Sequence, residues 1–189
     1  MFKLFIILFN LWALTVTLSP KEFDFENKTL QKELLKISET DQVKWKEIPF
    51  PETPGAYGTV QGKFLILPES NDLKKYIYAG RVNSCRQGGC SNPVQTLTIE
   101  TPEYFDYLIV FDSHFSVTQV KVYNYQATHG QEVANKGWLK QFQGYDGSRS
   151  LTVGKSIDAI SGATVSVLGI TNDIQEKTKL LKNLVEGKN

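Results

Sequence analysis

Hydrophobic positions follow two different spacings along the chain, and each spacing predicts one kind of element. Runs rich in aromatic and β-branched residues, bounded by turn-forming residues, are typical of strands. They occur at residues 62–67, 76–82, 94–99, 104–111 and 117–125. The first two are expected to pair antiparallel, and residues 112–116 supply the turn between the last two. In the last strand, alternation does not decide which of Tyr123 and Tyr125 lies on the buried face.

Helical spacing predicts three helices. Residues 30–37 form a short helix with Thr29 in position to cap it. Trp138 and Phe142 belong to a second short helix, which ends at Gly144. The third is an amphipathic C-terminal helix, and its apolar positions are Val165, Leu168, Ile174, Leu181, Leu184 and Val185. Three lysines in its last turns suit the negative end of the helix dipole: Lys177, Lys179 and Lys182.

Together these elements predict an α+β fold, in which a meandering antiparallel sheet has helices packed on one side. The chain has 189 residues, of which 41% are hydrophobic and 22% charged, so it can bury one ordinary core. Residues 20–189 are therefore expected to form a single domain. A formal net charge of +1 provides no strong field to attract nucleic acid or acidic lipid, which disfavours both classes of partner.

Residues 1–19 form a separate N-terminal segment. A lysine precedes a mainly apolar run at residues 4–14, which has the length of the apolar part of a signal peptide and is short for a membrane-spanning helix. Thr17 and Ser19 have the small size that a cleavage site needs, but Pro20 would follow the cut and is unfavourable there. A signal peptide and an uncleaved membrane anchor thus both stay open. Each predicts export, to the periplasm or the extracytoplasmic face of a membrane.

The only two cysteines, Cys85 and Cys90, lie close together in a glycine-rich segment. Outside the cytoplasm this spacing favours a local structural disulfide. A redox-active pair is the alternative, although four intervening residues differ from the Cys-x-x-Cys spacing of thiol oxidoreductases. A zinc site is disfavoured because His114 and His129 are the only histidines and neither has ligand spacing.

The candidate chemistry lies at residues 158–164, where Asp-Ala-Ile-Ser-Gly-Ala-Thr leads directly into the C-terminal helix. This order places the Thr164 hydroxyl beside the unpaired N–H groups of a helix start, where a phosphate is stabilised. Gly162 and Ala163 add no bulk, so a large group has room to approach. The alternative is an ordinary helix start, with Ser161 as the N-cap residue.

The segment closely resembles the flavinylation motif of the FMN-binding domain family. That motif begins with an aspartate, here Asp158, and ends with the threonine that carries FMN through a phosphoester, here Thr164. Ser161, Gly162 and Ala163 occupy the positions between them. The resemblance implies that a separate magnesium-dependent flavin transferase attaches the cofactor, with FAD as donor and AMP as the product released. No residue of this chain is assigned a catalytic role or a metal.

A second segment supports the resemblance. Thr128 and Gly130 match a loop that lies against the isoalloxazine ring in the family, and Trp138 and Phe142 match an aromatic pair between that loop and the motif. His129 departs from the family, which has a proline at this position. Since histidine titrates near neutral pH, a protonated His129 would stabilise reduced, anionic flavin. A loop histidine that bonds only to backbone is the alternative.

The function implied by the resemblance is electron transfer by an exported flavoprotein with covalent FMN. Its partners would be the flavin transferase during maturation and redox proteins or a membrane electron-transport complex afterwards. Flavinylated subunits of the sodium-pumping NADH:quinone reductase and of the Rnf complex contain such a domain, whereas this chain resembles a stand-alone form. Two alternatives remain: a flavin-free binding or structural domain of the same fold, and a flavin reductase for a small substrate.

Overall fold

The computed structural model describes residues 23–38, 45–50, 61–68, 74–84 and 103–187. Several predicted features lie outside these ranges, namely the N-terminal segment 1–19, the strand at 94–99, and Cys85 and Cys90 with their proposed disulfide. No helix within the ranges combines the length and apolar character that crossing a bilayer requires.

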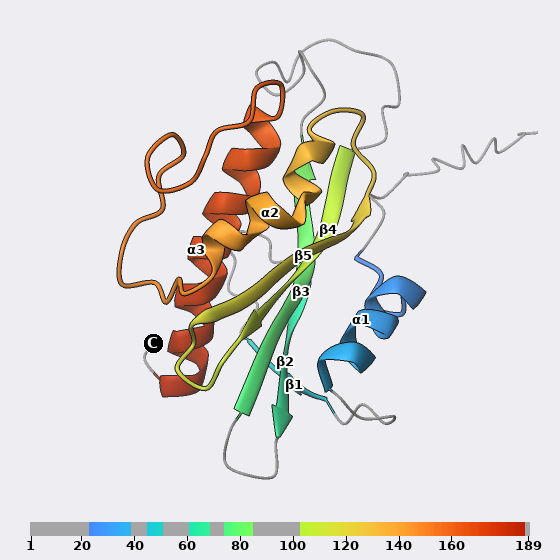
Figure 1. Ribbon diagram of the computed structural model, residues 1–189. Helices are drawn as coiled ribbons and strands as arrows, with labels where there is room; N and C mark the ends of the chain where they lie inside the picture. The colour runs from blue at the N-terminus through green and yellow to red at the C-terminus, as the bar shows by residue number, and fades with distance from the viewer. Residues whose placement is uncertain (1–22, 39–44, 51–60, 69–73, 85–102, 188–189) are drawn as a thin grey trace, which may run out of the picture.

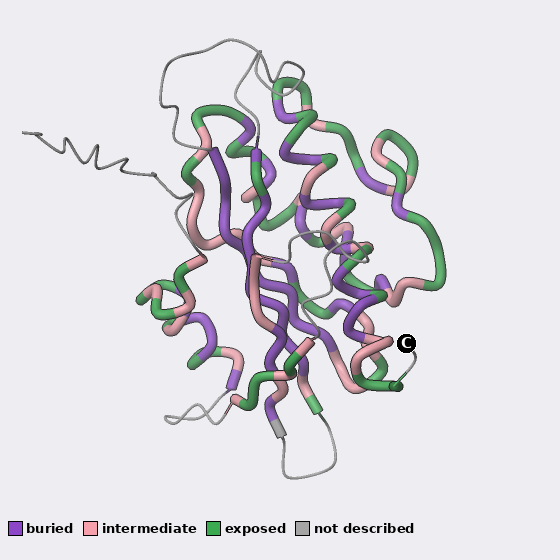
Figure 2. Tube along the Cα trace, turned by 180° about the vertical axis from the view of Figure 1, so that it is seen from behind, coloured by how far each residue is buried: buried purple, intermediate pink, exposed green. Residues whose placement is uncertain are grey.

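Five strands of the described chain form one antiparallel sheet in the order β1-β2-β3-β4-β5 (Figure 1). They are β1 Lys46–Ile48, β2 Gly62–Pro68, β3 Lys74–Ser84, β4 Glu103–Phe111 and β5 Val117–Tyr125. The predicted pairing of residues 62–67 with 76–82 is confirmed, with Phe64 opposite Tyr78. Every residue of β4 is buried, because packed layers cover both faces of the sheet there (Figure 2).

The helices lie on both sides of the sheet. α1 Lys28–Ser38 covers one face, where Leu30 and Leu34 pack against Ile77 and Leu108. The short helices η1 Gln131–Ala134, α2 Lys136–Leu139 and η2 Lys140–Phe142 accompany α3 Thr164–Glu186 on the other face (Figure 1). The α+β class, the antiparallel sheet and the C-terminal helix are confirmed, whereas packing on one side alone is corrected by the position of α1. The cap of α1 is also Asn27 rather than Thr29, since its side chain accepts the Thr29 N–H at 2.9 Å.

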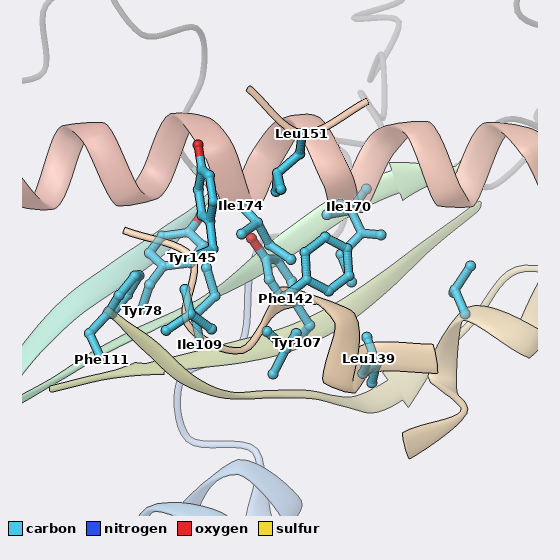
Figure 3. Packing of buried hydrophobic residues seen from close by; sticks show 14 of the residues in the cluster. Tyr78, Tyr107, Ile109, Phe111, Leu139, Phe142, Tyr145, Leu151, Ile170 and Ile174 are labelled. Atoms are coloured by element: carbon cyan, nitrogen blue, oxygen red, sulfur yellow. The ribbon is translucent and has the colours of Figure 1, made fainter. Parts of the chain in front are cut away.

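α3 buries only part of the predicted stripe: Ile174 and Leu181 are fully buried, and Leu184 is partly buried against the core. At the start of the helix, Val167 and Ile170 are fully buried, whereas the predicted Val165 and Leu168 are 46% and 44% exposed. Figure 3 shows Ile170 and Ile174 on the side of α3 that faces the sheet. The helix is amphipathic, but small and polar residues help to form its buried side, which shifts the stripe away from the large apolar positions at its start. Three buried polar residues of that side are Ser166, Thr171 and Thr178.

Lys177 also lies on the buried side of α3 and is 4% exposed. Its ammonium group contacts an Asp173 carboxylate oxygen at 2.7 Å, and the Tyr107 hydroxyl donates to the other oxygen at 2.5 Å. The lysine is therefore part of a buried polar network, whereas the sequence groups it with the lysines that suit the negative end of the helix dipole.

A β-bulge in β5 decides on which side of the sheet Tyr123 and Tyr125 lie. Asp106 pairs with Asn124 and Tyr107 pairs with Val122, so Tyr123 is the extra residue of the bulge. Such an insertion reverses the order of inward and outward side chains along a strand. Tyr123 packs with the α1 side of the core, whereas Tyr125 packs with the α3 side. The bulge therefore directs Tyr125 towards the start of α3.

Candidate functional site

The site is built around the turn that leads into α3. The Ala163 N–H donates to the carbonyl of Ile160 at 3.1 Å, and Gly162 between them has φ +81°. A left-handed residue at the third position defines a type II turn and favours glycine there. A Cβ on Gly162 would meet nothing within 4 Å, so the requirement for glycine is conformational and the space above the turn is open.

Thr164 is the first residue of α3 and is exposed, as are Ser161 and Gly162. The N-cap residue is Ala163, so the alternative in which Ser161 caps an ordinary helix start is wrong. Among the described residues no side chain caps the helix, and its first turn contains no acidic residue. The Thr164 hydroxyl thus stands at the positive end of a long helix dipole, where a phosphate group fits both sterically and electrostatically.

Two bonds fix the backbone of Asp158, where the motif begins. The Trp138 indole Nε1–H donates to the Asp158 carbonyl at 2.9 Å, and the Asp158 N–H donates to Gln141 Oε1 at 2.8 Å. Trp138 also packs edge-on against Phe142, with ring centroids 5.4 Å apart. Trp138, supported by Phe142, therefore holds the backbone of the motif in place, while the Asp158 side chain itself is exposed.

The predicted loop at residues 128–130 lies against the first turn of α3. A Cβ on Gly130 would lie 2.7 Å from Ser166 Oγ, and Gly130 has φ +83°, so this position requires glycine on both grounds. The Tyr125 hydroxyl donates to the carbonyl of His129 at 2.5 Å, and the Thr128 hydroxyl donates to the Glu103 carboxylate. The His129 side chain is exposed. The structure thus brings the loop and the motif together at one end of the sheet.

The sequence does not predict three hydroxyl groups that join these parts. Ser166 Oγ lies 3.1 Å from Ser84 Oγ and 3.3 Å from the Tyr125 hydroxyl. A serine on the buried side of an amphipathic helix is a usable signal for such a contact. Tyr125 and Ser84 carry no such signal, because their orientation depends on the bulge in β5 and on the pairing of β3 with β4.

Burial raises the pKa of Tyr125, and the bond with Ser166 only partly opposes this rise. The phenol therefore stays protonated over the physiological range and acts as a donor to His129. Trp45 packs on the α1 side of the sheet, away from the motif. Within the described ranges no group of histidine, cysteine or acidic side chains could hold a metal ion.

Residues 103–179 match the model of the FMN-binding domain family. This part of the chain belongs to that family. The FMN-binding domain comprises β4, β5, the short helices and most of α3, and it contains the loop, the aromatic pair and the motif. Comparison with curated proteins and with solved structures finds no match. Strands β1–β3 and helix α1 lie outside the matched residues, and β3 contributes Ser84 to the site.

Proposed function

We propose that this protein is an exported flavoprotein that carries FMN covalently on Thr164 and acts as an electron-transfer carrier. The family match supports FMN as the cofactor. The attachment residue is inferred from one observation above all, that the final threonine of the motif is the exposed first residue of an uncapped helix. When bound, FMN supplies redox chemistry with one or two electrons, and the protein holds and orients it.

Attachment requires an external enzyme, because Thr164 has no base beside it among its described contacts. In the proposed reaction, Thr164 Oγ attacks the phosphorus of FAD that belongs to its FMN half. The new bond joins that phosphorus to the threonine oxygen, the pyrophosphate bond breaks, and AMP leaves. The hydroxyl proton passes to a base of the magnesium-dependent flavin transferase, and no electrons are transferred. Exposure of residues 161, 162 and 164 gives that enzyme access to the turn.

The test is coexpression of the full chain with a flavin transferase, followed by intact mass measurement and flavin fluorescence after denaturing electrophoresis. The wild type should gain the mass of one FMN less one water, and Thr164→Val should gain none while its circular dichroism stays unchanged. Thr152→Val is a matched control, since Thr152 is exposed and lies outside the motif. Ser161→Ala tests whether the neighbouring hydroxyl is the acceptor instead.

The outcomes separate the alternatives. A wild type of unmodified mass would favour a flavin-free binding or structural domain, and flavin that survives denaturation in Thr164→Val would refute the choice of residue. Export predicts that the mature protein lacks residues 1–19 or stays with the membrane fraction. Reoxidation of the isolated reduced protein only by a small substrate would instead favour a reductase.

A further inference from the structure

A continuous chain of hydroxyl groups crosses the site from one strand to the loop. Ser84 at the end of β3, Ser166 in the first turn of α3 and Tyr125 at the end of β5 are consecutive members, with oxygen separations of 3.1 and 3.3 Å. The chain ends at the His129 carbonyl, 2.5 Å from the Tyr125 oxygen. Ser84 and Ser166 are 7% and 2% exposed, so water competes little for these bonds.

The direction of the chain follows from its last bond. A carbonyl oxygen only accepts, so the single Tyr125 proton must point to His129. Ser166 then donates to the Tyr125 oxygen, and Ser84 donates to Ser166. All three donors point towards the loop, and bonds aligned in this way strengthen one another.

The same groups also set how closely the loop approaches α3. The position of a Gly130 Cβ would be 2.7 Å from Ser166 Oγ and 3.1 Å from the Tyr125 oxygen. The loop therefore lies directly against both hydroxyls, and the Tyr125 hydroxyl also donates to it. Stacking of Tyr125 on Phe105, at 5.4 Å between centroids and 11° between ring planes, fixes the phenol in turn.

We propose that Tyr125 and Ser166 are positioning residues, which hold residues 128–130 against the start of α3 and so fix the wall of the flavin site. This inference rests on the proposed function, because it assigns the loop to a flavin tethered two residues before Ser166. Ser84 extends the chain of hydroxyl groups to β3, which lies outside the residues that match the family. The surroundings of the flavin in this chain thus depend on a strand that the matched domain does not contain.

The test uses two variants that each remove one oxygen, Tyr125→Phe and Ser166→Ala. Tyr125→Phe keeps the ring that stacks on Phe105. Tyr145→Phe and Thr171→Val are matched controls, because their buried hydroxyls have no hydrogen-bond partner in the described chain. All proteins are prepared both without flavin and after coexpression with the transferase.

The first measurement is amide hydrogen exchange of the flavin-free proteins at Val133, whose N–H donates to the Gly130 carbonyl at 3.2 Å. Tyr125→Phe removes the bond to the His129 carbonyl, and Ser166→Ala removes the donor that supports the Tyr125 oxygen. Each change should speed this exchange roughly fivefold, and the controls should leave it unchanged. The second measurement is the visible circular dichroism and midpoint potential of the flavinylated proteins. A looser wall should decrease the dichroism of the flavin and shift its potential, whereas a purely structural role would leave both unchanged.

Each outcome decides one question. Faster Val133 exchange with altered flavin signals in both variants, and in neither control, supports the inference. Unchanged Val133 exchange, or unchanged flavin signals in flavinylated variants, overturns the inference alone. Absence of flavin from the wild type overturns the proposed function and this inference with it.

Discussion

Gly130→Ala is the most informative single substitution at the site, because it tests the contact between the loop and α3 directly. Gly130 has φ +83°, and the added Cβ would lie 2.7 Å from Ser166 Oγ. Gly154 has the same φ of +83°, yet a Cβ there would meet nothing within 4 Å. Gly154→Ala therefore reproduces the backbone strain without the contact, and the difference between the two variants isolates the contact.

The magnitudes follow from these two environments. A left-handed conformation disfavours alanine by about 1–2 kcal/mol, and the lower entropy of the unfolded alanine chain offsets about 0.4–1 kcal/mol of this. Gly154→Ala should thus destabilise the protein by roughly 1 kcal/mol. Gly130→Ala adds overpacking against Ser166, typically about 1–3 kcal/mol. We expect its total loss to be about 2–4 kcal/mol.

The assay is urea unfolding of the full chain without flavin, followed by circular dichroism, with the slope of the transition compared between variants. Ser166→Ala should partly rescue Gly130→Ala, since it removes the oxygen at 2.7 Å and leaves the Ser166 Cβ at 3.3 Å. The double variant should therefore lose about 1 kcal/mol less than the sum of the single losses. Equal losses for Gly130→Ala and Gly154→Ala, or strict additivity with Ser166→Ala, would refute the close approach of the loop.

Two further predictions concern charged groups away from the flavin site. Burial raises the pKa of Glu33, but hydrogen bonds and attraction from two lysines, with Lys121 nearest at 2.6 Å, lower it below its ordinary value of 4.5. The stability that this carboxylate contributes is present above that ordinary value and is lost as pH falls through the lowered one, so Glu33→Gln should flatten the acid limb of unfolding free energy against pH. Asp173→Asn should reduce the unfolding free energy in urea by about 3 kcal/mol, because it removes the carboxylate at 2.7 Å from the buried Lys177 and leaves only the exposed Glu176 carboxylate at 4.0 Å. Tyr107 would then donate to a neutral amide oxygen in place of a carboxylate. A loss below about 1 kcal/mol would mean that water or a rearranged Lys177 compensates the pair.

Most of the fold follows from local pattern. The strands at 104–111 and 117–125 have continuous apolar or alternating runs, and the observed bounds of β4 and β5 agree with them within a residue. What local pattern does not contain is the side on which each helix packs. α1 has one apolar stripe, and nothing within that stripe distinguishes the two faces of a sheet whose strand β4 is buried on both.

The predicted burial of the start of α3 is wrong for a related reason. Val165 and Leu168 are the natural choice for a buried face, yet the start of the helix contacts the ends of β3 and β5 through Ser166, which lies on another side of the helix. Ser166 and Val167 face the protein there instead. Lys177 is buried because the Asp173 carboxylate compensates its charge, and Tyr107, which is far away in the sequence, donates to the other oxygen of that carboxylate. Hydrophobicity alone therefore misplaces these residues.

At the site, the sequence predicts the turn into α3, but it does not predict the buried contacts that hold this turn in place. The motif residues are mostly exposed, so burial of their own side chains contributes little to their rigidity. Rigidity must come from their neighbours, namely Trp138 and Gln141 at the Asp158 backbone and the buried Val167 beneath the helix start. Substitutions of the exposed motif side chains should accordingly change flavin attachment with little effect on stability, apart from the left-handed Gly162. Substitutions of the residues beneath them should change both. This separation is what allows attachment chemistry to be tested without unfolding the protein.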